Sequence, residues 1–530
     1  MLTEETPWSS LLQAAVLLVA FLTISLPVLL CNLNASRHSR KGSGGLLLPP
    51  SPWRLPLVGN LHQLGRFPHR SLHSLAVAHG PVMRIHLGMV PAIVVSSADA
   101  AREVLQVQDH VFASRPSLSI PSILFYGCTD LAFAPHGPYW SRLRKLSVNH
   151  LLSPSRVRSC AAAREQEVEV LLRRVASAGG VVRLSELLSD FAKDVAGRIV
   201  LGTRAAGDEG WRAKLDALLE EIVPMLGSFH VGDCIPWLSW LSAVDGTDAR
   251  ARRAFQSIDH ILDEIVGDAE REVRPPGPGG ETHDGAFLHL LLSMMKEREP
   301  AGRLLDRDNV KALLVDLFGA GTEAMIVVLE WAMAELLCNK GAMQKLQQEV
   351  RRRGAMATDH NSLLLMVTDQ DLPGMQYLRA VVKETLRLHT PGPLLLPHNS
   401  MQATRLGQGR YHVPSDTMVI VNAWAIARDP GAWESPEDFR PERFAGSTVD
   451  FRGQHFELIP FGSGRRMCPG MNLGVSTVEL ALANLVGRFD WELPVEDDKE
   501  KIDMQEAPGF VVRKKAPLRA VAVMPSGGIY

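Results

Sequence analysis

The chain has 530 residues, of which 46% are hydrophobic and 22% charged, and its formal net charge is −2. This composition excludes an intrinsically disordered chain and leaves enough apolar residues for a large core. The near-neutral charge indicates no nucleic-acid partner. The six cysteines are widely scattered and form no Cys-x-x-Cys pair, which argues against a zinc site or a disulfide framework.

An uncharged apolar segment lies near the N-terminus. Residues 11–30 read LLQAAVLLVAFLTISLPVLL, and about 20 such residues match the thickness of a bilayer core. Two glutamates precede the segment and basic residues follow it between positions 37 and 41, so the positive-inside rule places the N-terminus in the lumen. We expect residues 1–10 to be luminal and residues 11–31 to be a transmembrane anchor. A cleaved signal peptide is the alternative, although no basic region precedes the segment.

Closely spaced prolines follow. Residues 48–56 read LPPSPWRLP, a stiff spacer that cannot be helical. We therefore expect residues 32–60 to be a basic and proline-rich hinge. No convincing linker or internal repeat divides residues 61–530, which are expected to form one domain.

Most of this domain is helical in pattern, with smaller β regions. Residues 81–97 read as two short strands around a turn at Gly88. Residues 115–134 are loop-like with many apolar side chains. Residues 229–241 (FHVGDCIPWLSWL) are aromatic for a loop. They belong either to the core or to a second surface that dips into a membrane interface.

The longest predicted helix covers residues 310–337 and would span about 42 Å. Gly319 and Gly321 flank Ala320 at its middle, at a cost of roughly 1 kcal/mol for each glycine. Close approach of another group to the helix accounts for this cost, and packing of a second helix against the small residues is the alternative.

Two pairs of polar residues are spaced to share a helix face. Trp140 and Arg144 are four apart and can both donate hydrogen bonds to one carboxylate. Glu384 and Arg387 are three apart and can form an ion pair. Taken alone, a pair of this kind is usually a surface contact worth under ~1 kcal/mol.

A cysteine lies in a loop with two arginines just before it. Residues 461–470 read FGSGRRMCPG and run into an apolar helical pattern. A thiolate that ligates a metal needs positive potential and N–H donors, which the glycine turns and the start of the helix supply. Phe461 is placed to cover such a site, and Arg466 to pair with an anionic cofactor edge. A lone cysteine is otherwise a small buried apolar residue.

This loop resembles the haem-ligand loop of cytochromes P450, Phe-x-x-Gly-x-Arg-x-Cys-x-Gly, at every defined position. Five motifs occur in the family's order across residues 48–525, and the chain is similar to plant A-type microsomal members. The resemblance implies the cytochrome P450 fold, mainly α with smaller β regions, preceded by one N-terminal transmembrane helix. It also implies heme b, with residues 61–530 as the haem-thiolate catalytic domain.

The resemblance also implies roles for individual residues. Cys468 would be the axial thiolate on the iron. The other cofactor-binding residues would be Trp140, Arg144, His398, Phe461, Arg466 and Gly470. A buried network behind the haem would consist of Glu384, Arg387 and Arg443. The substrate pocket would include Leu124, Phe125, Leu394, Leu395 and Phe510.

The implied activity is a monooxygenase reaction that inserts one oxygen atom from O2 into a small lipophilic metabolite, as in secondary metabolism. Electrons would come from NADPH through the membrane-bound NADPH–cytochrome P450 reductase. The chain would be a single-pass protein of the endoplasmic reticulum membrane, in contact with membrane lipid, with its catalytic domain in the cytosol.

One departure touches the chemistry. Ala320 would lie over the haem and Glu323 in a proton-delivery route, but Ala324 replaces the threonine that the family has next. Thr322 lies about 200° around the helix from this position and faces away. The departure keeps open a haem-thiolate isomerase or dehydratase that uses no reductase. A non-enzymatic membrane haem-binding protein is a further alternative.

Overall fold

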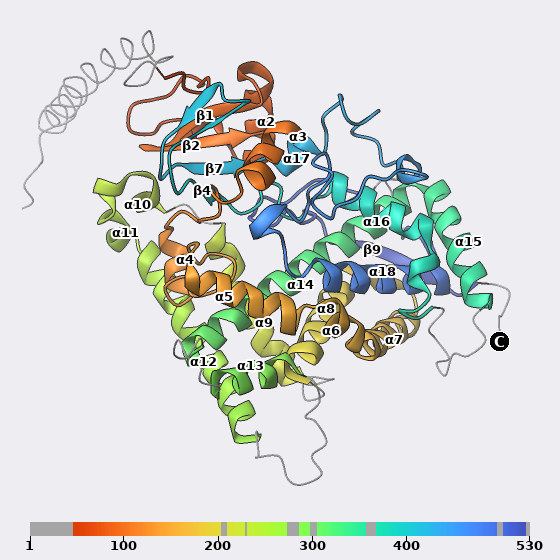
Figure 1. The fold of residues 1–530 in the computed structure, drawn as a ribbon. Helices are drawn as coiled ribbons and strands as arrows, with labels where there is room; N and C mark the ends of the chain where they lie inside the picture. Colours follow the sequence, from red (N-terminus) through yellow and green to blue (C-terminus); the bar gives the residue numbers. More distant parts are fainter. Residues whose placement is uncertain are drawn as a thin grey trace, which may run out of the picture.

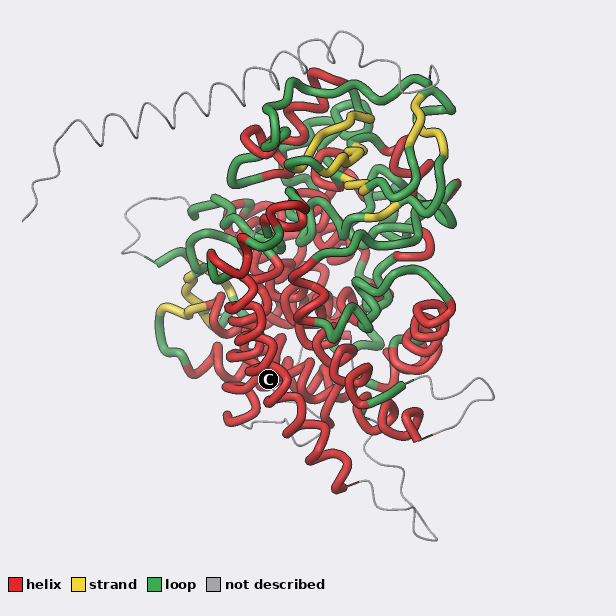
Figure 2. The backbone as a smooth tube through the Cα atoms, turned by 90° about the vertical axis from the view of Figure 1, so that its left-hand side faces the viewer, coloured by secondary structure: helices red, strands yellow, loops and turns green. Residues whose placement is uncertain are grey.

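The computed structural model describes residues 46–202, 209–227, 230–272, 286–296, 305–356, 367–494 and 502–525. The predicted anchor at residues 11–31 lies outside the described residues. Figures 1 and 2 show a mainly helical protein in which most strands gather at one end of the molecule.

The described part of the chain is mostly helical, as the sequence predicts. The helices of eight or more residues are α2 (Pro68–His79), α5 (Pro138–Leu146), α7 (Ala161–Ser177), α8 (Leu184–Leu201), α9 (Glu209–Leu226), α12 (Thr247–Glu272), α13 (Phe287–Lys296), α14 (Arg307–Cys338), α15 (Lys340–Met356), α16 (Gln376–Leu388) and α18 (Met471–Arg488). The shorter α-helices are α3 (Ala98–Arg102), α4 (Ser119–Leu124), α6 (Pro154–Ser159), α10 (Val231–Cys234), α11 (Leu241–Val244) and α17 (Ala423–Ile426). Single 3-10 or π turns are η1 (Leu61–Gln63), η2 (Glu103–Val107), η3 (Ser147–Leu151), η5 (Pro236–Leu238), η6 (Leu372–Gly374), η7 (Pro441–Phe444) and η8 (Gly464–Arg466).

Three small sheets accompany the helices. The largest has the order β1-β2-β7-β4, made of β1 (Val82–Leu87), β2 (Val90–Val95), β7 (Met418–Val421) and β4 (His398–Asn399). Its β2–β7 pair is parallel and its other pairs are antiparallel. The others join β3 (Val181–Arg183), β9 (Arg519–Val523) and β8 (Asp490–Glu492), and β5 (Thr404–Leu406) with β6 (Tyr411–Val413). The two strands predicted between residues 81 and 97 are β1 and β2.

Helix α14 is the centre of the helical part (Figure 1) and packs against α8, α18 and α16. It begins at a capping box, in which the Asp306 carboxylate accepts from the Asn309 N–H at 2.8 Å and the Asn309 side chain accepts from the Asp306 N–H at 3.0 Å. The helix is long and apolar enough to cross a membrane, but its residues are mostly buried inside the protein. Its length therefore reflects a core role.

One segment differs from the prediction. Residues 115–134 were expected to be a loop, yet Ser119 to Leu124 form α4. The Asp233 carboxylate accepts hydrogen bonds from the Ser119 backbone N–H at 3.1 Å and from its hydroxyl at 2.6 Å. This contact with a residue 114 positions away caps the short helix.

Candidate functional site

The cysteine loop is held by its backbone between η8 and α18. The Cys468 N–H donates to the Phe461 carbonyl at 2.9 Å. Gly462 and Gly464 have φ angles of +68° and +67°, which side-chain-bearing residues rarely adopt. A Cβ atom at Gly464 would overlap the Leu105 carbonyl oxygen, so the turn requires glycine there. These constraints position the sulfur atom at the start of α18.

The Cys468 thiol lies among surrounding protein atoms. Its side chain is accessible, yet burial raises the pKa of the thiol because the charged form loses solvation. The N–H groups of Gly470 and Met471 and the positive charge of Arg144 oppose this rise. An accessible sulfur surrounded by N–H donors and a cation is suited to bind a metal as the thiolate.

The middle of α14 has an open face. Between Asn309 and Leu337, Ala320 is the one exposed residue, while Gly319, Gly321 and Ala324 are half-buried. A Cβ atom added at either glycine would meet nothing within 4 Å. The described part of the chain therefore leaves space along these residues and packs no other helix against the two glycines.

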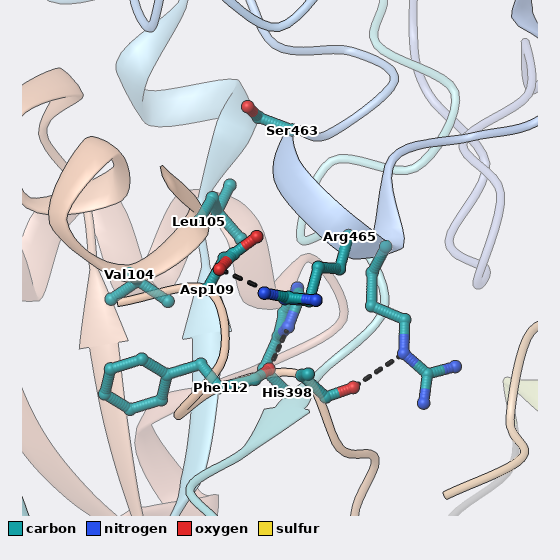
Figure 3. Close-up of a pocket in the computed structure, with 9 residues that line it drawn as sticks. Val104, Leu105, Asp109, Phe112, His398, Ser463 and Arg465 are labelled. Atoms are coloured by element: carbon teal, nitrogen blue, oxygen red, sulfur yellow. Dashed lines mark hydrogen bonds and ion pairs between the residues drawn. The ribbon is translucent and has the colours of Figure 1, made fainter. Parts of the chain in front are cut away.

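A cluster of basic residues lies in and beside the small pocket shown in Figure 3. His398 and Arg466 both line this pocket. The Arg466 Nε and Nη2 atoms donate to the carbonyls of Ala113 and Ala134, each at 2.6 Å. Arg115, which is buried, donates to carbonyls in the same region, those of Leu396 and Pro397, each at 2.9 Å. Backbone carbonyls hold the guanidinium groups in place without neutralising their charge.

The positive charges of this cluster repel one another, which adds to the effect of burial in lowering the pKa values of Arg466 and His398. Burial, followed by Arg115, lowers the pKa of Arg466 to about 8 and that of His398 to about 3. Burial lowers the pKa of Arg115 to about 10, with Asp130 opposing the change. The Arg144 side chain is half-buried, makes no hydrogen bond or ion pair with another described side chain, and lies close enough to Cys468 for their charges to interact. The cluster therefore favours an anionic group with more than one carboxylate.

Arg115 was missed by the sequence reasoning. It belongs to no motif, and the one signal was a lone arginine at the start of an apolar segment. Trp140 also differs from expectation, since its indole N–H donates to the Leu131 carbonyl at 3.0 Å. The Arg466 guanidinium lies 3.9 Å from the Trp140 ring centroid, so Trp140 supports this arginine by stacking.

Glu384, Arg387 and Arg443 come together in the structure. Arg387 binds the Glu384 carboxylate through Nε at 2.8 Å and Nη2 at 2.9 Å, and Arg443 Nε binds it at 2.9 Å. The side chains of Glu384 and Arg387 are 0% exposed. The remaining Arg387 N–H groups donate to the carbonyls of Ala427, Pro436 and Asp438.

Glu323, the α14 residue predicted to deliver protons, is bound by an arginine. Arg513 binds the Glu323 carboxylate through both Nε, at 2.9 Å, and Nη2. The Glu323 side chain is 5% exposed, whereas that of Arg513 is 40% exposed. The Thr322 hydroxyl donates to the Phe318 carbonyl at 2.6 Å and is buried. A proton path from solvent to Glu323 would therefore have to pass the partly exposed Arg513 that covers its carboxylate.

The predicted pocket residues do not gather in one apolar cluster. Leu124 and Phe125 are buried in the large helical core. Leu394 packs against the cluster of the β1–β2 sheet, and Leu395 against a second cluster beside it. Phe510 is half-buried, with its backbone near Gly227 at the end of α9.

Comparisons with known proteins agree with this arrangement. The sequence model of the family described as Cytochrome P450 matches residues 49–519. Cytochrome P450 71A1 of Persea americana is 43% identical over 96% of this chain and 99% of its own length. Norfluorocurarine oxidase of Strychnos is 42% identical over 89% of this chain and 91% of its own length. A solved zebra fish cytochrome P450 with abiraterone has a TM-score of 0.71 at 24% identity, and the match covers 87% of this chain and 99% of that one.

The fold and the cysteine site define a haem-thiolate oxidoreductase. The chain belongs to the cytochrome P450 family, whose members are monooxygenases that hold haem iron by a thiolate. The residues present fit that cofactor: an accessible cysteine, an open face on α14, and a basic cluster suited to the two carboxylates of haem.

Proposed function

We propose that this protein inserts one oxygen atom from O2 into a small lipophilic metabolite, using electrons from NADPH delivered by NADPH–cytochrome P450 reductase. The observation that carries the proposal is the accessible Cys468 thiol at the start of α18, in a fold whose central helix has an open face. Haem, when bound, supplies the reduction and activation of O2. The protein supplies the ligand, the position of the substrate and the protons.

Each part of the site has a proposed task. Cys468 ligates the iron, with Phe461 and Gly470 in its loop. The haem carboxylates pair with Arg144, Arg466 and Arg115, and His398 lies beside them. Ala320 and Ala324 leave room for O2 and substrate on the open face of α14.

Proton delivery takes an unusual form in this proposal. Alanine at position 324 cannot donate a hydrogen bond, and the Thr322 hydroxyl is bound to a carbonyl. A polar group of the substrate or an ordered water therefore takes the role of the missing hydroxyl. Glu323 receives protons from solvent when its contact with the half-exposed Arg513 opens.

Two exposed tryptophans in the α10–α11 region indicate which surface of the protein faces the membrane in this proposal. Trp237 and Trp240 are 57% and 59% exposed, and the Trp237 N–H lies 3.0 Å from the Met89 sulfur. This contact joins the α10–α11 region to the turn between β1 and β2, and Figure 1 shows the two side by side. Tryptophan is favoured at the membrane interface, so this surface would rest on the endoplasmic reticulum membrane, with residues 11–31 as the anchor and the catalytic domain in the cytosol.

The relative named norfluorocurarine oxidase supports a plant metabolite as the substrate class. The test is reconstitution of the full chain with reductase in lipid vesicles, with NADPH consumption and product measured across a library of lipophilic metabolites. Turnover that needs both NADPH and reductase supports the proposal. Turnover without them would instead identify the isomerase or dehydratase that Ala324 motivates. Intact haem with no turnover across the library would indicate a non-enzymatic haem-binding protein.

A further inference from the structure

Two aspartates from distant parts of the sequence lie close together, Asp130 buried and Asp316 half-buried. Asp130 belongs to the segment 115–134, and Asp316 lies on α14, one turn before Ala320. The Asp316 Oδ2 accepts from the Leu131 N–H at 2.7 Å, and the Asp130 Oδ2 accepts from the Phe133 N–H at 2.8 Å. The two carboxyl groups also lie within hydrogen-bonding reach of each other.

The pair needs a proton to be stable. Asp130 is fully buried, and its Oδ1 atom has no hydrogen-bond partner among the described residues. Two adjacent buried carboxylates repel each other, whereas a carboxylic acid can donate to a carboxylate. Burial raises the pKa of Asp130 to about 6, and burial together with Asp130 raises the pKa of Asp316 well above its usual range. The repulsion is therefore relieved when Asp316 keeps a proton and donates it toward the Asp130 carboxylate.

The surrounding charged and titratable groups leave this assignment in place. Arg466 and Arg115 face Asp130 and stabilise its ionised form. Tyr139 and Cys128 also face the pair, and burial raises the pKa of both side chains. Because both pKa values are raised, neither side chain adds a negative charge beside the pair near neutral pH.

The segment that Asp316 binds through Leu131 also contacts the basic cluster. The segment 115–134 carries Leu124 and Phe125, which the family resemblance assigns to the substrate pocket and which pack in the helical core. Its Leu131 carbonyl accepts from the Trp140 N–H at 3.0 Å and from Arg466 at 3.4 Å. A change in the position of this segment would therefore reach the pocket wall and the basic cluster together.

We propose that Asp130 and Asp316 form an acid–carboxylate pair that positions segment 115–134 against α14 and thereby shapes the substrate pocket. The inference rests on the proposed function, because this segment borders a substrate only if the proposed monooxygenase reaction takes place at the site. Loss of the proton places two negative charges together and loosens the segment. Because the pKa of Asp316 is raised in the folded protein, the stabilisation is fully present below the ordinary pKa of an aspartate and is lost as the pH rises through the raised value.

Amide hydrogen exchange of the holoenzyme tests the contact without requiring turnover. In the wild type, protection of the Leu131 and Phe133 amides should fall about tenfold or more as the pH rises through the raised pKa of Asp316, as expected for loss of a charge-assisted hydrogen bond. Asp316→Asn keeps an acceptor for Leu131 and donates a permanent N–H to Asp130, so its protection should not fall. Asp308→Asn, on an exposed residue in the first turn of α14, should behave as the wild type.

Binding of 4-phenylimidazole, followed by haem absorbance, tests the effect on the pocket. Its affinity should fall with rising pH in the wild type and in Asp308→Asn, but not in Asp316→Asn. Asp316→Ala should bind weakly at every pH. If Asp316→Ala does not fold, the comparison of the two asparagine variants decides the matter. Equal pH profiles for these two variants, or a loss of protection without any change in probe binding, would overturn the proposal. Neither measurement depends on NADPH or reductase, so a failure here is distinguishable from a failure of the proposed function.

Discussion

Replacing Glu384 by alanine removes the carboxylate that neutralises a fully buried arginine. Glu384 receives two bonds from Arg387, one from Arg443 and one from the Arg440 backbone N–H, all between 2.8 and 2.9 Å. After the substitution, Arg387 keeps only its bonds to backbone carbonyls. Its charge then stays buried without an opposite charge from Glu384.

Breaking a buried pair in this way costs about 3–5 kcal/mol. The chain offers a matched control, since Arg183 and Glu186 have the same spacing of three residues. Their side chains are 74% and 63% exposed, and such a pair is worth under ~1 kcal/mol. Glu384→Ala should therefore lower the free energy of unfolding by at least about 2 kcal/mol more than Glu186→Ala. This difference is roughly 30-fold in the ratio of folded to unfolded protein.

The assay is denaturant unfolding of both holoenzyme variants in the same detergent, followed by circular dichroism and haem absorbance. Glu384→Ala should unfold and release haem at clearly lower denaturant concentration than Glu186→Ala. Equal midpoints for the two variants would refute the reasoning, because they would show that Arg387 does not depend on the Glu384 charge.

Three further outcomes are expected. Cys468→Ser should lose the thiolate signature of the reduced carbon-monoxide complex, whereas Cys128→Ser should leave that spectrum intact. An unchanged spectrum in Cys468→Ser would show that Cys468 is not the iron ligand. Ala324→Thr should lower the hydrogen peroxide released per NADPH with substrate analogues that lack a hydroxyl, and equal coupling in both proteins would show that this position does not limit proton delivery. In a chain without residues 1–40, the double change Trp237→Ser and Trp240→Ser should reduce the vesicle-bound fraction in sedimentation, and an unchanged fraction would remove this surface from the membrane interface.

The sequence alone determined the family and the main elements of the fold. The haem-ligand motif can be recognised from the sequence because its ten residues are contiguous. Their identities and spacing define the motif without any tertiary information. The helix at 310–337 and the strands around Gly88 follow from local hydrophobic periodicity, which residues near in sequence generate among themselves.

Only the tertiary structure decided which charges meet outside the predicted Glu384, Arg387 and Arg443 network. Arg513 lies 190 positions from Glu323, and Asp130 lies in a segment that no motif connects to Asp316. The effect of each charge on its partner depends on distance and burial, and neither quantity is encoded by spacing along the chain. For the same reason Arg115 looked like an ordinary loop residue until the fold buried it beside Arg466.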